Sequence, residues 1–203
     1  MTRVTLLERV FSPRWFQRFA ILVFGAYARL FMGLRVIGGH NVPKEGPLVV
    51  ACNHFSAWDP PIVGVAIPRG LDFMAKVELF ESALNAAFLR GLGAFPVDRS
   101  RGDVGAIKEA LRRLKRGRAV GVFIEGTRNP AGGAALDGAA FLAIAAGAPL
   151  CPAAVWREGS SFRVAFGEPI QPSGKGREAA SRLTALTAGH IRDLLPENVR
   201  NAV

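Results

Sequence analysis

The sequence predicts an α/β protein with a mostly parallel mixed sheet that is flanked by helices. Short apolar runs of strand length alternate with longer amphipathic segments, and this alternation is typical of parallel sheets. The chain has 203 residues, of which 50% are hydrophobic, so we expect one domain with a substantial core. The expected strands are residues 34–38, 48–52, 71–76, 93–97, 119–125, 150–156 and 162–166.

The segments between these strands carry helical patterns. Residues 103–116 show the clearest one, because apolar side chains recur there every three or four positions and basic side chains fill the positions between them. We expect further helices at residues 78–90, 136–147 and 177–195, the last of which ends before Pro196.

The first 34 residues differ from the rest and predict membrane-associating helices, ahead of an α/β domain at residues 35–203. They mix arginines with aromatic and aliphatic side chains around a single acid, Glu8, as do helices that lie in the headgroup plane. The longest apolar run, residues 19–28, is about half the roughly 20 residues that a spanning helix needs. Two alternatives stay open: a helix packed on the core with snorkelling arginines, and a tilted spanning helix.

The net charge indicates which classes of partner the protein binds, and the cysteines indicate the redox state of its compartment. The 26 basic and 16 acidic residues give a formal net charge of +10, which favours nucleic acid, anionic lipid headgroups or phosphorylated small molecules. The two cysteines, Cys52 and Cys151, lie in apolar runs and form no C-x-x-C unit, so we expect free buried thiols, which suit a reducing compartment.

A histidine and an aspartate five positions apart form the first candidate site. The segment N-H-F-S-A-W-D-P-P follows a buried strand, which places His54 at the carboxyl end of that strand. The two prolines mark Asp59 as the N-cap of the next helix. A turn between them can bring the carboxylate onto the imidazole, where it fixes the tautomer and leaves the other nitrogen free to accept a proton. We therefore predict that His54 is a general base and Asp59 its orienting partner.

Other interpretations of this segment are weaker. A surface histidine beside an aspartate that only caps a helix is the alternative without chemistry. Ser56 lacks the G-x-S-x-G context of a serine nucleophile. His40 and His190 show no spacing of metal ligands, so we expect no metal site.

Two further motifs place arginines just after strands. Arg99 follows G-A-F-P-V-D, and Arg128 ends E-G-T-R. Because the carboxyl ends of parallel strands share one edge, both arginines are expected near His54, where together they suit a phosphate. The backbone N–H of Gly126 is a candidate donor to a developing oxyanion.

In their order and spacing these motifs resemble those of the 1-acyl-sn-glycerol-3-phosphate acyltransferase family. The family pattern N-H-x-S-x-x-D is present at residues 53–59, the D-R pair at 98–99 and E-G-T-R at 125–128. An apolar run centred on Pro152 matches the fourth block, and F-M-A-K ends at Lys76. The resemblance covers residues 35–170 and implies the glycerolipid acyltransferase fold with N-terminal membrane-facing helices.

The resemblance also implies an activity. His54, held by Asp59, deprotonates the sn-2 hydroxyl of 1-acyl-glycerol-3-phosphate, which attacks an acyl thioester and gives phosphatidic acid for phospholipid biosynthesis. The donor is acyl-coenzyme A or acyl-acyl carrier protein, with no cofactor and no metal. The enzyme works as a monotopic or peripheral protein on the cytoplasmic face of the membrane. The residues expected to bind substrate are Lys76, Arg99, Glu125, Gly126, Thr127 and Arg128.

One departure from the family pattern bears on the acceptor. Relatives commonly carry a lysine associated with the acceptor phosphate where this chain has Leu136. The alternative is therefore the same reaction on another lysophospholipid or a lyso-aminolipid. A more distant alternative is a non-catalytic basic module for nucleic acid or membrane. The chain shows neither an aromatic RNA-binding motif nor a helix-turn-helix pattern, so we expect no nucleic-acid partner.

Overall fold

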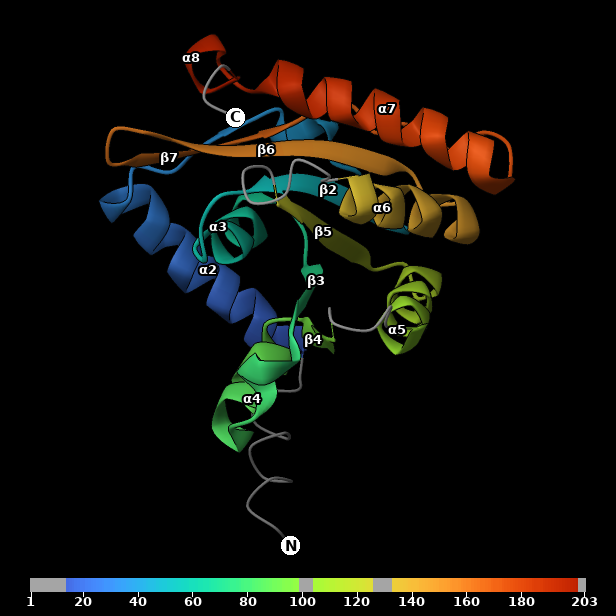
Figure 1. The fold of residues 1–203 in the computed structure, drawn as a ribbon. Coiled ribbons are helices and arrows are strands. Elements are labelled where there is room, and N and C mark those ends of the chain that lie inside the picture. The colour runs from blue at the N-terminus through green and yellow to red at the C-terminus, as the bar shows by residue number, and fades with distance from the viewer. Residues whose placement is uncertain (1–13, 99–103, 126–132, 201–203) are drawn as a thin grey trace, which may run out of the picture.

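A computed structural model of the chain describes residues 14–98, 104–125 and 133–200. Its centre is a seven-stranded sheet with the order β1-β7-β6-β2-β5-β3-β4 (Figure 1). The strands are β1 (Arg35–Ile37), β2 (Leu48–His54), β3 (Leu71–Lys76), β4 (Ala94–Val97), β5 (Ala119–Glu125), β6 (Leu150–Glu158) and β7 (Ser161–Phe166). The β6–β7 pair is antiparallel and the other neighbouring pairs are parallel, which confirms the predicted mostly parallel mixed sheet.

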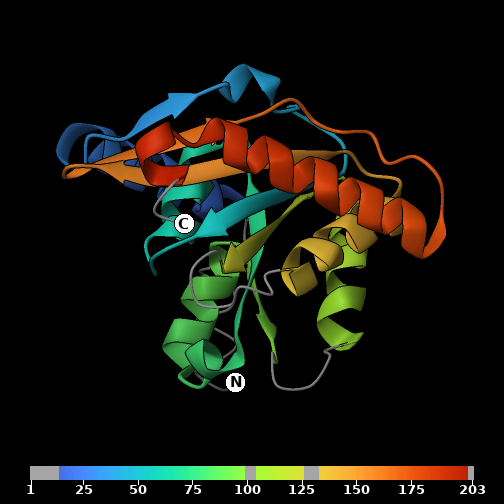
Figure 2. The same ribbon diagram turned by 45° about the horizontal axis from the view of Figure 1, so that its top comes forward.

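Helices cover both faces of the sheet (Figures 1 and 2). On one face lie α2 (Arg14–Phe31) and α3 (Asp59–Ala66). On the other lie α5 (Val104–Lys115), α6 (Gly133–Ala146) and α7 (Gly176–Leu194). The shorter elements are α4 (Ala83–Gly91), α8 (Glu197–Arg200) and two 3-10 turns, η1 (Gly39–Asn41) and η2 (Val77–Phe80).

The central strand β2 shows why the two faces need this cover. Its first six residues are all buried, as in a parallel strand packed on both sides. Val50 and Cys52 belong to the core that contains α2 and α3, whereas Val49 and Ala51 belong to the core that contains α5, α6 and α7. The alternation of side chains along one strand thus joins two cores.

The expected helix at residues 78–90 is divided in the structure. Residues 77–80 form the 3-10 turn η2, and α4 begins only at Ala83. Ser82 separates the two, because its backbone is extended, with φ −80° and ψ 129°. The single-helix prediction for this segment was therefore wrong.

The buried side-chain amide of Gln17 joins helix α2 to the rest of the domain by hydrogen bonds. Gln17 is 6% exposed, and its Nε2 donates to the carbonyl of Leu71 at 3.2 Å and to that of Leu92 at 2.9 Å. Its Oε1 accepts a hydrogen bond from Arg118 at 2.8 Å.

The outer side of α2 is exposed and apolar. The large side chains there are Trp15, Phe19, Leu22, Val23, Tyr27, Leu30 and Phe31. Among the residues that the structure describes, no helix combines the length and the apolar character needed to cross a bilayer. Membrane association of the N-terminal segment stays a prediction.

Candidate active site

His54 and Asp59 meet at the end of β2. His54 is the last residue of the strand, Asp59 is the first residue of α3, and the turn between them brings His54 Nδ1 to 3.0 Å from Asp59 Oδ2. A carboxylate accepts the Nδ1 proton, so the second ring nitrogen, Nε2, carries the lone pair that can take a proton. The His54 side chain is 22% exposed, which leaves the ring accessible.

Asp59 receives more hydrogen bonds than the one from His54. Its Oδ2 also accepts from the backbone N–H of Phe55 at 2.5 Å and of Ser56 at 2.7 Å, while Oδ1 accepts from the Ser56 hydroxyl at 3.0 Å. Burial by itself would raise the pKa of Asp59, but these hydrogen bonds, led by that from His54, outweigh it and hold the pKa below its ordinary value. Asp59 is thus an ionised, fixed acceptor for the imidazole.

Asp59 does not cap α3, contrary to the prediction. The helix begins one residue earlier than expected, with Trp58 at the N-cap position. Pro60 and Pro61 have no N–H to be capped, and the N–H of Ile62 already donates to the carbonyl of Trp58 at 3.0 Å. The carboxylate is therefore free to turn back and bind the loop that carries His54.

Ser56 braces this loop. Its hydroxyl donates to Asp59 and accepts from the backbone N–H of Trp58 at 3.2 Å. The hydroxyl proton is thereby directed at a carboxylate rather than at the His54 ring, so the structure gives no support to a serine nucleophile.

Asn53 fixes the strand just before the histidine. The backbone pairing of β2 with β6 extends only to the Cys52–Ala153 pair. Beyond this pair, the side-chain amide of Asn53 replaces the backbone hydrogen bonds between the two strands. Its Nδ2 donates to the carbonyl of Val155 at 2.8 Å, and its Oδ1 accepts from the backbone N–H of Val155 at 2.7 Å. Sequence reasoning missed this role, since Val155 lies 102 residues away.

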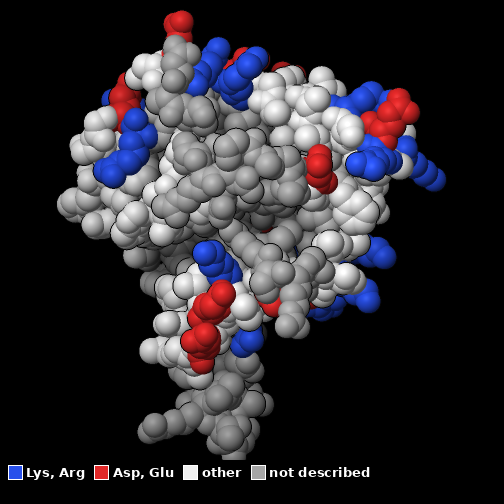
Figure 3. All heavy atoms as spheres, viewed as in Figure 1, with Lys and Arg blue, Asp and Glu red and all other residues white. Residues whose placement is uncertain are grey.

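Two of the other predicted site residues, Lys76 and Glu125, end strands at the same edge of the sheet. In the backbone register Glu125 stands opposite His54, and the exposed Lys76 stands opposite the half-buried Val97 at the ends of β3 and β4. The side chain of Glu125, as well as Arg99, Gly126, Thr127 and Arg128, lies outside the described residues. Their substrate-binding roles stay predictions. In the same orientation as Figure 1, basic side chains are spread over the visible face, including both ends of α7 and the edge near α5 (Figure 3).

An almost wholly apolar pocket of about 330 Å³ lies beside the His54–Asp59 turn. Trp58, Pro60, Pro61 and Gly64 form its α3 side. The remaining wall comes from α2, β3 and α4 and includes Ala20, Ile21, Phe24, Leu71, Phe73, Phe88 and Leu92. No local pattern in the sequence predicts this pocket, because its residues come from four separate segments whose apolar side chains are typical of an ordinary core.

Leu136 is a core residue. Only 6% of it is exposed, and it belongs to the cluster formed by β2, β5, α5, α6 and α7. The resemblance leads us to expect a phosphate-binding lysine at this position. In this chain the position is occupied by a leucine that packs in the core.

The chain is similar to known acyltransferases. A family model described as Acyltransferase matches residues 33–156. Over 166 residues the chain is 33% identical to the 1-acyl-sn-glycerol-3-phosphate acyltransferase of Bacillus subtilis (strain 168), covering 76% of this chain and 83% of that protein. The enzyme of the same name from Pseudomonas aeruginosa is 29% identical over 199 residues, covering 89% and 75%.

A solved structure is similar as well. The crystal structure of the 1-acyl-sn-glycerophosphate (LPA) acyltransferase, PlsC, from Thermotoga maritima gives a TM-score of 0.65 at 25% identity, covering 86% of this chain and 78% of that one. The chain belongs to the acyltransferase family.

Proposed function

We propose that this protein transfers a fatty acyl group from an acyl thioester to the sn-2 hydroxyl of 1-acyl-glycerol-3-phosphate and so forms phosphatidic acid. The observation that carries the proposal is the His54–Asp59 pair, 3.0 Å apart beside an apolar pocket. The names of the similar enzymes support this choice of acceptor.

The reaction follows from the state of the imidazole. His54 Nε2 takes the proton of the acceptor hydroxyl while Asp59 stabilises the imidazolium that forms. The hydroxyl oxygen attacks the thioester carbonyl, and the tetrahedral oxyanion collapses with cleavage of the carbon–sulfur bond. The imidazolium returns the proton to the departing thiolate, so that the base is regenerated.

The apolar pocket is suited to the acyl chain of the donor. Trp58, Pro60 and Pro61 connect it to the His54–Asp59 turn, and its lining offers few polar groups. An acyl chain gains from leaving water for such a space. The donor is acyl-coenzyme A or acyl-acyl carrier protein.

The acceptor phosphate requires cations at the carboxyl edge. Lys76 is exposed at the end of β3, and Arg99 and Arg128 follow the ends of β4 and β5 in the sequence. Their charges and their places along the chain support binding of a phosphate monoester. Replacement of Arg99 or Arg128 by alanine is expected to raise the KM for the acceptor more than the KM for the donor.

A second acceptor is favoured by one observation. The chain has Leu136, which is packed into the core, at the position where the resemblance leads us to expect a lysine that binds the acceptor phosphate. The alternative is the same transfer to another lysophospholipid or to a lyso-aminolipid. A panel of lysolipids decides between the two: marked preference for 1-acyl-glycerol-3-phosphate removes the alternative.

The proposed place of action is the membrane, on its cytoplasmic face. The exposed apolar side of α2 and the net charge of +10 support attachment to an anionic lipid surface. The free, buried thiols of Cys52 and Cys151 agree with a reducing compartment.

The experiment is thiol release from palmitoyl-coenzyme A and from palmitoyl-acyl carrier protein, with and without 1-oleoyl-glycerol-3-phosphate. We expect acceptor-dependent release with at least one donor, and loss of about 10²–10⁴-fold in His54→Ala. Addition of a chelator is expected to change nothing. Acceptor-independent release, or full activity of His54→Ala, contradicts the proposal.

A further inference from the structure

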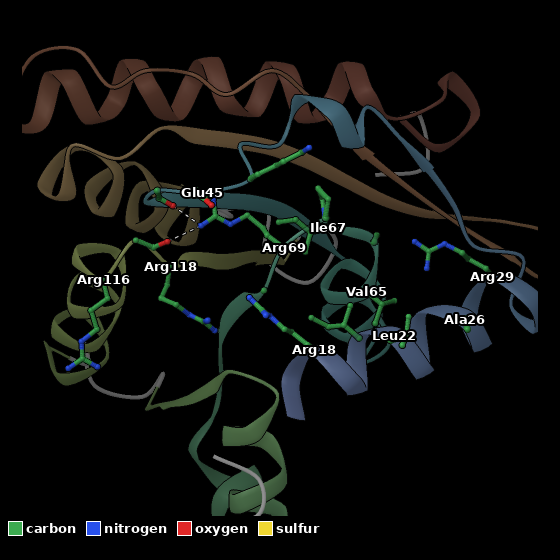
Figure 4. Close-up of a pocket in the computed structure, with 17 residues that line it drawn as sticks. Arg18, Leu22, Ala26, Arg29, Glu45, Val65, Ile67, Arg69, Arg116 and Arg118 are labelled. Carbon is green, nitrogen blue, oxygen red and sulfur yellow. Dashed lines mark hydrogen bonds between the residues drawn. The ribbon is translucent and has the colours of Figure 1, made fainter. Parts of the chain in front are cut away.

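A second, larger cavity lies at the opposite edge of the sheet from His54. It has a volume of about 820 Å³ and is formed by the three loops that precede the central strands, together with α2 and the end of α3 (Figure 4). These loops contribute residues 44–46 before β2, 67–70 before β3 and 116–118 before β5. We call this cavity the basic groove.

The basic groove is lined by six cations and one acid. The cations are Arg18, Arg29, Lys44, Arg69, Arg116 and Arg118, and the acid is Glu45. Figure 4 shows Arg18 reaching from α2 toward Arg118, while Arg29 and Arg116 stand toward opposite ends of the groove. Burial first, and then the positive charge of Arg118, lower the pKa of Arg69 from its ordinary value, while the negative charge of Glu45 opposes them.

Two of these cations hold the groove together. Arg69 donates to the carbonyls of Pro43 at 2.8 Å, Gly46 at 2.7 Å and Gly117 at 2.9 Å. Arg118 is paired with Asp72, and its Nε lies 2.9 Å from Oδ2 of that residue. Both guanidinium groups therefore fix the shape of the groove.

Three other cations of the basic groove are exposed to solvent. Among the described residues, the side chains of Arg18, Lys44 and Arg116 make no hydrogen bond or ion pair. Three unpaired cations around a shaped hollow are arranged to receive an anion rather than to stabilise the fold.

The groove also has an apolar wall. Leu22 and Ala26 of α2 face it together with Val65 and Ile67 near the end of α3. The exposed apolar side of α2 lies next to this wall, since Leu22 belongs to both. A ligand with a phosphate and a hydrocarbon part matches this combination better than a free phosphate does.

We infer that the basic groove binds the phosphate headgroup of an anionic phospholipid, at a site separate from the one that binds the acylated substrate. The phosphate lies among Arg18, Lys44 and Arg116, and the adjoining hydrocarbon lies against the α2 and α3 wall. This inference deepens the proposed membrane association and does not depend on the reaction at His54.

The test is binding of the whole protein to vesicles of phosphatidylcholine, with and without phosphatidylglycerol. The variant is Arg18→Gln, Lys44→Gln, Arg116→Gln. The control removes three exposed cations from the opposite face, at the start and end of α7: Lys175→Gln, Arg177→Gln, Arg192→Gln. Near a lipid surface each cation contributes about fivefold in affinity. We expect the groove variant to lose about 10- to 100-fold on anionic vesicles, and the control to lose much less.

Three outcomes overturn the inference. One is equal loss in the groove variant and the control, which assigns binding to net charge alone. Another is the absence of wild-type binding to anionic vesicles. The third is release of wild type from vesicles by glycerol 3-phosphate at an ionic strength at which chloride has no effect, which assigns the groove to soluble phosphate esters. Thermal unfolding checks that all variants are folded, and acceptor-dependent thiol release tests the proposed function separately.

Discussion

Two buried aspartates, Asp59 and Asp72, organise opposite ends of the sheet in different ways. Asp59 is 3% exposed, and its carboxylate accepts hydrogen bonds from His54, Phe55 and Ser56 in the turn just before it. Asp72 is 1% exposed and is held by Arg118 and by Arg113, whose Nη1 lies 3.0 Å away. The first carboxylate has a titratable partner that remains accessible, whereas the second is enclosed by permanent cations.

Because their partners differ, Asp59 can take part in catalysis, whereas Asp72 has a structural role. An imidazole that is held on one nitrogen can exchange protons through the other, so Asp59 serves a site. Guanidinium groups stay protonated, so Asp72 can only join elements, here β3 with α5 and the start of β5. Each of the following predictions tests whether this division holds, beginning with the largest effect.

Asp59→Asn is expected to lower kcat by about 10²–10⁴-fold, because the amide cannot stabilise the imidazolium and its NH₂ opposes the N–H donors of the loop. Steady-state thiol release measures the effect, with circular dichroism as the check on folding. The matched variant is Asp72→Asn, for which kcat per folded molecule is expected to stay unchanged. Equal losses of kcat in the two variants would remove the distinction.

Asp72→Ala is expected to reduce the free energy of unfolding by about 3–5 kcal/mol, because Arg113 and Arg118 are left without their buried counterion. Urea denaturation measures it. The control is Asp137→Ala, which removes an exposed carboxylate bonded to Thr184 and is expected to cost less than about 1 kcal/mol. A loss for Asp72→Ala no larger than that of the control would show that the arginine cluster is not what joins β3 to α5.

Acidification is expected to separate wild type from Asp59→Asn. The folded pKa of Asp59 lies below its ordinary value of about 3.9. Its ionised form therefore stabilises the fold at pH values above that ordinary pKa, and this contribution is lost as the pH falls through the folded pKa. Unfolding free energies between neutral pH and pH 3 are expected to fall more steeply for wild type. If the unfolding free energies of wild type and Asp59→Asn fell in parallel with pH, the lowered pKa of Asp59 in the folded protein would be contradicted.

Gly64→Leu leaves both aspartates in place and is expected to change only which acyl chain is used. Gly64 lines the apolar pocket, and a Cβ atom there meets no atom within 4 Å, so a leucine fills the pocket without a clash at its Cβ. We expect kcat/KM to fall about 10-fold for palmitoyl donors and to change little for decanoyl donors. The control is Gly189→Leu on α7, which also has open space at its Cβ. An equal change for both chain lengths would contradict an acyl pocket.

The same contrast explains how far the sequence could be interpreted. Patterns within ten residues predict the strands and the contact between His54 and Asp59 through the turn after β2. The structure has these features close to where they were expected. The Asp72 cluster joins residues 46 positions apart, and Gln17 reaches Arg118 across 101 positions, so no local pattern announces either. The buried state of Leu136 likewise depends on neighbours from other elements.

Boundaries were less predictable than elements. The α3 cap was displaced by one residue because two prolines removed the donors that Asp59 would have capped, and Ser82 interrupted an otherwise continuous helical pattern. The roles of Arg99 and Arg128 stay predictions, since both residues lie outside the described parts of the chain.

The buried amide of Gln17 limits how the enzyme can meet a lipid. Lifting α2 away would break the hydrogen bonds of this amide to Leu71, Leu92 and Arg118, each of which contributes on the order of 1 kcal/mol. Helix α2 and strand β3 therefore move as one body. The position of His54 relative to the exposed apolar side of α2 is therefore set when the protein folds.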